Sequence, residues 1–133
     1  MMEKTYAMLK PDAVKAGHIG EIIARFERAG LVIERMELAE VTPEQAQANY
    51  AEHEGKPFYE GLIRYITSGP VVKLVLAGEG AVAITRKLMG ATDPAQALPG
   101  TIRGDFGLMM DANVIHGSDS LESAERERAI FFG

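Results

Sequence analysis

A histidine near the carboxyl end of the chain, His116, has neighbours that suit a nucleophile. Val114 and Ile115 before it belong to a short apolar run typical of a strand, and Gly117 after it removes bulk beside the ring. An ordinary imidazole has a pKa of about 6.5 and is largely neutral at pH 7, so it can attack without a separate base. A helix is expected to begin just beyond, and free N–H groups at a helix start favour a nearby anion. By position alone, a surface histidine in a helix-cap turn is the more common arrangement.

Two arginines bracket a long segment that has no periodic apolar pattern. Arg86 comes shortly before this segment, residues 90–104, and Arg103 lies near its end, with Thr92 inside it. Long loops in compact domains are usually either functional or disordered. Guanidinium groups bind phosphate oxygens through paired hydrogen bonds, so the pattern is typical of a loop that closes over a polyphosphate. Each arginine taken alone would equally suit a solvated surface.

The composition excludes several other chemistries. The chain of 133 residues has no cysteine, which excludes disulfides, thiolate nucleophiles and thiolate metal sites. The remaining histidines, His18 and His53, are not at metal-ligand spacing from each other or from His116, so no metal held by the protein is expected. The net charge of −5 argues against a general nucleic-acid-binding protein, and no specific nucleic acid is expected as a partner.

One glycine-rich segment resembles a dinucleotide-binding loop. Gly78-Glu79-Gly80-Ala81-Val82-Ala83 matches G-x-G-x-x-A between an expected strand and an expected helix. Downstream, however, the chain enters the long loop instead of a second parallel strand. A Walker-type phosphate loop is also absent from the sequence. A nucleotide would therefore have to be bound by residues outside either of these two loop motifs.

The elements that must position these residues can be predicted from apolar spacing and capping residues. Strands are expected over 5–9, 31–40, 71–77 and 113–115, and helices over 19–29, 42–50, 58–67, 80–89 and 119–130. Thr42 and Pro43 have the types expected at the cap and first position of a helix. Asp119 and Glu122 are spaced as the cap and the reciprocal partner of the last helix.

The order of these elements predicts an α+β fold of the ferredoxin-like split βαβ type. It should contain a four-stranded antiparallel sheet with helices packed on one face, and residues 1–133 should form a single domain. The composition, 47% hydrophobic and 25% charged, is that of an ordinary globular protein. Neither a signal peptide nor an apolar run of about 18 residues is present, so we expect a cytoplasmic protein without a membrane partner.

The stretch Asn113-Val114-Ile115-His116-Gly117-Ser118-Asp119-Ser120 closely resembles the active-site signature of nucleoside diphosphate kinases. Other family motifs resemble segments spread from residue 3 to residue 132: 10–14, 50–53, 56–58, 68–72 and 101–106. An eight-residue match supported by further motifs along the chain is much more specific than a single glycine pattern. The resemblance favours the catalytic interpretation of His116.

The resemblance implies a ping-pong transfer of a γ-phosphoryl group from a nucleoside triphosphate to a nucleoside diphosphate, through a phosphohistidine at His116. The residues to which it assigns a part in binding the nucleotide are Lys10, Phe58, Arg86, Thr92, Arg103 and Asn113. Phe58 would stack on the base, which implies broad tolerance of bases and sugars. The residues to which it assigns a supporting part are Tyr50, Leu62, Ser118 and Glu127, the last two as a pair that steadies the histidine. Without the family match, Phe58 and Leu62 would suit a helix core equally well, and Glu127 would suit a pair with Arg126 or Arg128 in solvent.

The resemblance also implies a cofactor and an assembly. Mg²⁺ would be carried by the nucleotide phosphates and not by a cage of carboxylates. The chain would form a homo-oligomer, a dimer that builds into a tetramer or a hexamer, and the sequence does not decide between these states. Two other functions stay open: a nucleotide sensor that keeps the pocket without catalysis, and a histidine phosphocarrier that serves protein partners.

Overall fold

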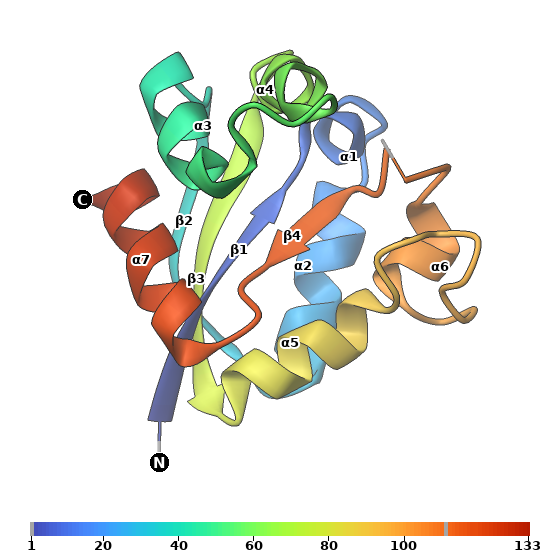
Figure 1. Cartoon of the computed structure of the whole chain (residues 1–133). Coiled ribbons are helices and arrows are strands. Elements are labelled where there is room, and N and C mark those ends of the chain that lie inside the picture. Colours follow the sequence, from blue (N-terminus) through green and yellow to red (C-terminus); the bar gives the residue numbers. More distant parts are fainter. Residues whose placement is uncertain (1, 111) are drawn as a thin grey trace.

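A four-stranded sheet forms the centre of the molecule in the computed structural model, which describes residues 2–110 and 112–133. The strands are β1 (Met2–Leu9), β2 (Val32–Ala39), β3 (Val71–Glu79) and β4 (Ile115–Gly117). They lie in the order β2-β3-β1-β4, and every neighbouring pair is antiparallel (Figure 1). The predicted α+β fold with a four-stranded antiparallel sheet is therefore confirmed.

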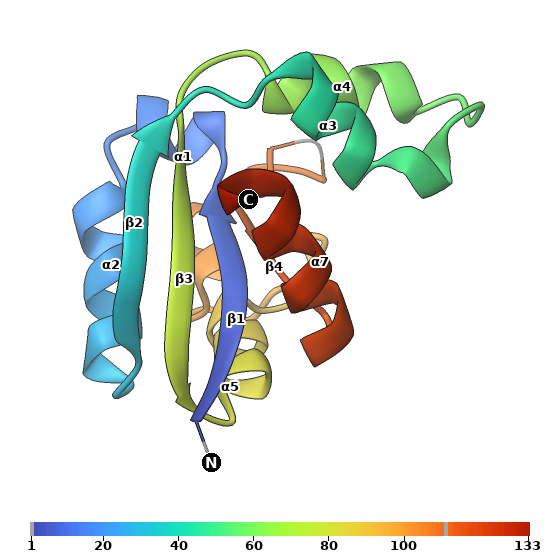
Figure 2. The same cartoon turned by 90° about the vertical axis from the view of Figure 1, so that its left-hand side faces the viewer.

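Helices cover both faces of this sheet (Figure 2). Alternate residues of β1 point to opposite faces, as the period of a strand requires. Ala7 and Leu9 pack with α2 (Ile19–Arg28) and α5 (Ala81–Met89), whereas Tyr6 and Met8 pack with α3 (Pro43–Asn49), α4 (Tyr59–Ile66) and α7 (Leu121–Phe132). The prediction of helices on one face was wrong. Strands β1 and β3 are apolar on both sides, a pattern that requires a cover on each.

The helices α3 and α4 belong to an insert between β2 and β3, with the short 3₁₀ helix η1 (Ala51–His53) between them. Thr42 caps α3: its hydroxyl accepts from Gln45 N at 3.1 Å, and its own N–H donates to the Gln45 side chain. The predicted helix start is thereby confirmed. Helix α4 has few buried residues, so the insert projects from the sheet beside the end of β1 (Figure 1).

Besides the 3₁₀ helix η1, two short α-helices were not predicted. The turn after β1 is helix α1 (Pro11–Lys15), and the end of the long loop is α6 (Ile102–Phe106), capped by the Thr101 hydroxyl. Each has only five residues, too few to show an apolar period in the sequence. Among the described residues, no helix is long and apolar enough to cross a membrane.

The region around the candidate nucleophile differs from its prediction in two details. Strand β4 begins two residues later than expected, so His116 lies inside the strand and pairs with Met8. The cap of α7 is Ser120, whose hydroxyl accepts from Ser123 N, and not Asp119. A cap one residue later is equally compatible with the local sequence, because serine and aspartate cap helices about equally well.

Candidate active site

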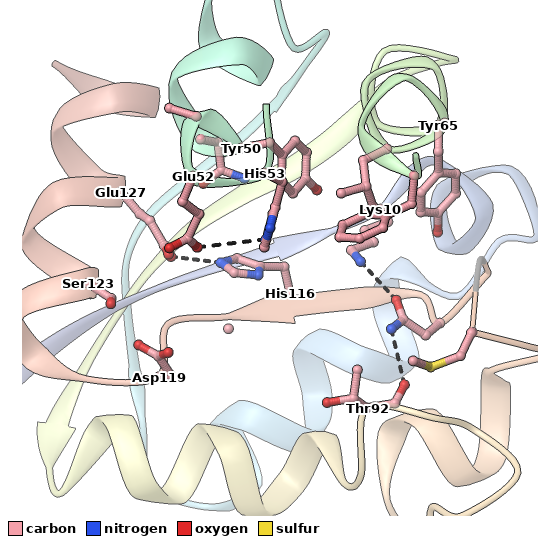
Figure 3. A pocket seen from close by; sticks show the side chains of 18 of the residues that line it. Lys10, Tyr50, Glu52, His53, Tyr65, Thr92, His116, Asp119, Ser123 and Glu127 are labelled. Carbon is pink, nitrogen blue, oxygen red and sulfur yellow. Dashed lines mark hydrogen bonds and ion pairs between the residues drawn. The ribbon is translucent and has the colours of Figure 1, made fainter. Parts of the chain in front are cut away.

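The predicted site residues converge on one cavity of about 1330 Å³ between α3–α4, α7 and the carboxyl end of α5 (Figure 3). All of them except Ser118 line this cavity, and they are Lys10, Tyr50, Phe58, Leu62, Arg86, Thr92, Arg103, Asn113, His116 and Glu127. Ser118 lies buried behind the cavity wall, against Glu127. Residues separated by up to about a hundred positions in sequence thus share one site.

His116 is held through one of its two ring nitrogens. Its Nε2 lies 2.7 Å from Glu127 Oε1, and Figure 3 shows the ring reaching from β4 toward α7. The imidazole side chain is 30% exposed, whereas that of Glu127 is 5% exposed. A carboxylate only accepts hydrogen bonds, so Nε2 carries the proton and the lone pair of a neutral ring is at Nδ1. Nδ1 is therefore the available nucleophilic atom.

The carboxylate of Glu127 is itself fixed by a second donor. The hydroxyl of buried Ser118 donates to Glu127 Oε1 at 2.6 Å, so the pair implied by the resemblance is in contact. Burial works to raise the pKa of Glu127, but the hydrogen bonds from His116 and Ser118 outweigh it and hold that pKa below its ordinary value. The group is thus an ionised carboxylate at neutral pH. Arg126 also lies 3.5 Å from its Oε2, but Glu127 is no solvent-exposed partner of that arginine.

Gly117, beside the histidine, packs closely against the Met89 side chain of α5. A Cβ added there would overlap the sulfur of Met89. The glycine therefore lets the strand approach the helix closely, and the site gains its position relative to α5. This reason differs from the removal of bulk beside the imidazole that the sequence suggested.

The two arginines, Arg86 and Arg103, line the cavity beside the backbone of β4. Arg86 donates to the Gly117 carbonyl at 3.0 Å. Arg103 is buried and donates to three backbone carbonyls, those of Asn113, Gly90 and Ile115, at 3.4, 3.3 and 2.7 Å. Burial, followed by the nearby charge of Arg86, lowers the pKa of Arg103 to about 10. Arg103 therefore ties the backbone around β4 together and still presents a positive charge to the cavity.

Lys10, Asn113 and Thr92 form a chain of hydrogen bonds along the cavity wall (Figure 3). The Lys10 amine donates to Asn113 Oδ1 at 2.8 Å, and the Asn113 amide donates to the Thr92 carbonyl at 3.1 Å. Burial, with the charge of Arg103, lowers the pKa of Lys10 to about 8. The lysine is thus cationic at neutral pH but loses its charge in mildly alkaline solution.

The wall contributed by residues 48–65 mixes aromatic, apolar and charged side chains and is largely exposed. Phe58 precedes α4 and is 51% exposed, so the alternative of a core residue is wrong for this side chain. The ring of His53 lies 5.3 Å from that of Phe58. Leu62 follows one turn later on the same wall. Tyr50 is half-buried at the end of α3, and its burial raises the pKa of the phenol to about 12, so the hydroxyl stays protonated.

Several lining residues were not predicted. The sequence assigned no role in the site to five further residues that line the same cavity, and these are Glu52, His53, Tyr65, Met110 and Asp119. The only signal in the sequence for His53, Glu52 and Asp119 was their place inside the motifs that resemble the family. Nothing in the sequence distinguishes Met110 from a surface residue, because its position depends on the path of the loop before β4.

A histidine held by a buried carboxylate, three cationic side chains and an exposed aromatic ring around one cavity are typical of an enzyme that transfers phosphoryl groups between nucleotides. The comparisons with known proteins agree with this class. The family model described as nucleoside diphosphate kinase matches residues 3–133. The chain therefore belongs to the nucleoside diphosphate kinase family, as the sequence predicted, and the prediction of a kinase is confirmed with it.

Relatives and solved structures resemble the chain over nearly its whole length. A nucleoside diphosphate kinase of Thermus thermophilus is 59% identical over 131 residues, which cover 98% of this chain and 96% of the relative. That of Exiguobacterium sibiricum is 58% identical, with 98% and 95% covered. The structure of the Halobacterium salinarum enzyme in complex with CDP has a TM-score of 0.96 at 48% identity, covering 99% of this chain and 88% of that one. The Aquifex aeolicus enzyme has a TM-score of 0.94 at 38% identity, covering 100% and 96%.

Proposed function

We propose that His116 Nδ1 attacks the γ-phosphorus of a nucleoside triphosphate and is the resting place of the phosphoryl group between two half-reactions. A P–N bond forms as the bond between γ-phosphorus and the bridging oxygen breaks, and the nucleoside diphosphate leaves. A second diphosphate then attacks the phosphohistidine through its terminal oxygen, and the ring returns to its neutral form. The observation that carries this proposal is the contact of Nε2 with Glu127, which leaves Nδ1 free in a ring that lines the cavity.

The charged residues of the cavity suit this transfer. Catalysis of phosphoryl transfer consists mostly of alignment and charge stabilisation. Lys10, Arg86 and Arg103 supply three positive charges, and Glu127 stabilises the positive charge that develops on the ring as Nδ1 attacks. Asn113 is hydrogen-bonded to Lys10 and to the Thr92 carbonyl, and its second amide hydrogen would donate to the phosphate or the ribose. A bound CDP in the Halobacterium salinarum enzyme supports a nucleotide as the ligand of this cavity.

Mg²⁺ fits the cavity as a companion of the nucleotide. Among the described residues there is no group of three or more carboxylates and histidines that could hold a metal. Glu52 and Asp119 line the cavity, and a hydrogen bond from Ser123 lowers the pKa of Asp119. Mg²⁺ commonly uses one or two carboxylates, several waters and the substrate phosphates. When bound, the ion would neutralise phosphate charge, while these two carboxylates hold its waters.

The base would stack on Phe58. An exposed ring reads no hydrogen-bond pattern, because every base presents a π-face. This supports the use of purine and pyrimidine nucleotides alike, with ribose or deoxyribose.

The chain would work as a single domain in the cytoplasm and as a homo-oligomer. Strand β2 lies at one edge of the sheet, and Val32, Met36 and Leu38 on it are each more than half exposed. An apolar edge strand is a template for pairing with another strand, and a second copy of β2 provides a self-complementary partner. Sedimentation velocity of the purified chain tests this: a monomer at micromolar concentration would contradict it.

The kinase mechanism is tested by incubating the chain with γ-³²P-labelled ATP and Mg²⁺. The protein should acquire a label that is stable in alkali and labile in acid, and any unlabelled nucleoside diphosphate should remove it. A nucleotide sensor would acquire no label. A phosphocarrier for proteins would hold the label until a protein acceptor is added, so exchange among free nucleotides alone distinguishes the two.

A further inference from the structure

The backbone two residues before His116 adopts a strained turn. Val114 has a φ of 62°, in the left-handed region, which is disfavoured for a β-branched side chain. Ile115 N donates to the Asn113 carbonyl at 2.8 Å across it, which makes Val114 the central residue of the rarer, positive-φ type of γ-turn. The turn delivers the Asn113 side chain to Lys10 on one side and begins β4, which carries His116, on the other.

Such a strained turn persists only where surrounding contacts stabilise it. The Asp12 side chain of α1 makes one of these contacts. Its Oδ2 accepts from Val114 N at 3.1 Å. The Val114 carbonyl accepts in turn from Lys10 N at 2.8 Å, so both polar groups of the strained residue have partners from the segment after β1. These partners lie about a hundred positions away in sequence.

The Asp12 carboxylate also contacts helix α4, which carries part of the wall around Phe58. The Tyr65 hydroxyl of α4 donates to Asp12 Oδ1, and burial, together with this hydrogen bond, raises the pKa of Tyr65 so that it stays a donor. The Lys10 amine lies 5.5 Å from the centre of the Tyr65 ring. Asp12 is not among the residues that line the cavity, whereas Tyr65 is. Asp12 therefore links α4 to the turn before β4 without facing the substrate.

We propose that Asp12 is a positioning residue for phosphoryl transfer: its carboxylate holds the γ-turn at Val114, and thereby sets Asn113 and His116, while Tyr65 joins this turn to the nucleotide-binding helix α4. The proposal rests on the proposed kinase mechanism. Its physical basis is that a small displacement of the reacting groups is enough to reduce the rate of a well-aligned reaction.

The test measures the rate at which excess enzyme acquires label from γ-³²P ATP, with saturating nucleotide. Asp12→Ala should slow this step by about 10- to 100-fold, as expected for misplaced reacting groups, while the Kd for ADP changes by less than about threefold. Glu44→Ala, an exposed acidic residue in the first turn of α3, is the matched control for loss of a charge at a helix start and should leave the rate unchanged.

Three further variants separate an effect on positioning from an effect on general stability. Glycine adopts positive φ freely, so Val114→Gly should restore most of the rate in the Asp12→Ala background. Asp12→Asn, whose amide can still accept from Val114 N and donate to the Tyr65 oxygen, should stay close to wild type. Tyr65→Phe keeps the contact of Asp12 with Val114 N and should change neither the transfer rate nor the Kd for ADP by more than about threefold.

An unchanged labelling rate in Asp12→Ala would overturn the proposal. An equal defect with and without Val114→Gly would overturn it as well, because relief of the turn would then be irrelevant. Should Asp12→Ala fail to fold, Asp12→Ser removes the same contacts with a residue well suited to a helical first turn and is judged by the same two outcomes. Absence of label on the wild-type protein would instead refute the kinase mechanism and would be seen before any variant is made.

Discussion

The two walls of the cavity are built in different ways. The wall around His116 consists of buried groups with fixed partners: Glu127 and Ser118 are 4% and 1% exposed and hydrogen-bonded to each other. The wall around Phe58 belongs to an insert whose residues are largely exposed, and Phe58 itself is 51% exposed. Bond formation depends on sub-ångström alignment, whereas stacking tolerates different ring shapes. The comparison supports the proposal that the buried wall around His116 aligns the reacting groups, while the exposed wall around Phe58 accepts different bases.

The largest effect is expected from loss of the nucleophile. His116→Ala should abolish labelling by γ-³²P ATP and reduce turnover by roughly 10⁴-fold or more, as removal of a covalent nucleophile does in other enzymes. The circular dichroism spectrum should not change, because the imidazole is partly exposed. His18→Ala, remote from the cavity, serves as the control. If His116→Ala still exchanged phosphate at the wild-type rate, the phosphoryl group would have to pass directly between two bound nucleotides.

A smaller effect is expected from neutralising the carboxylate of Glu127, which contacts His116 Nε2. Glu127→Gln keeps the size of the side chain but removes the carboxylate that fixes the imidazole and stabilises its developing charge. The kcat should fall by about 10²-fold with KM little changed, in the range of general acid–base contributions. The matched control is Glu125→Gln on the exposed side of the same helix. A rise in KM at constant kcat would show that Glu127 acts on binding and not on the reaction.

Substitutions in the wall around Phe58 should change KM and leave kcat unchanged. Phe58→Ala removes a stacking contribution of about 1–3 kcal/mol and should raise KM by roughly tenfold for adenine, guanine, cytosine and uracil nucleotides alike. Tyr59→Ala, the neighbouring aromatic residue that does not line the cavity, should have little effect. If the loss were confined to one base, the wall would be reading specific hydrogen bonds, and the contrast between the two walls would disappear.

The mildest effect is expected from the titration of Lys10, which is hydrogen-bonded to Asn113 in the cavity. The pKa of Lys10 is about 8 in the folded protein, so the side chain loses its charge as pH rises through this value. The kcat/KM of wild type should therefore fall by about a few-fold between pH 8 and pH 9. Lys10→Met should lack this alkaline decrease, and Lys15→Met, an exposed lysine of α1, should keep it.

Stability should change with pH in the opposite sense to this activity. The pKa of Lys10 is about 8 in the folded protein and near 10.5 in an unfolded chain, so the unfolded chain binds more protons between these values. The free energy of unfolding of wild type relative to Lys10→Met should therefore rise with pH from about 8 to 10. A parallel fall in stability and activity would indicate a general alkaline transition and not the titration of Lys10.

Much of the fold was accessible from the sequence because its signals are local. Thr42 and Gln45 satisfy each other's backbone within one helical turn, and strand β3 is a continuous apolar run. The strand containing His116 was placed two residues too early because Val114 looks like a strand residue by type. Its left-handed turn depends on partners near residue 10, and no local pattern reveals them.

The sequence by itself determined the family, the α+β class and ten of the residues that line the cavity. Only the tertiary structure decided which nitrogen of His116 is free, that helices cover both faces of the sheet, and how Lys10 and Asp12 hold the backbone before β4. The physical reason is the range of the interactions. Residue types and helix caps depend on near neighbours, whereas the contacts of Asp12 and Lys10 join segments about a hundred residues apart and exist only once β1 and β4 pair in register.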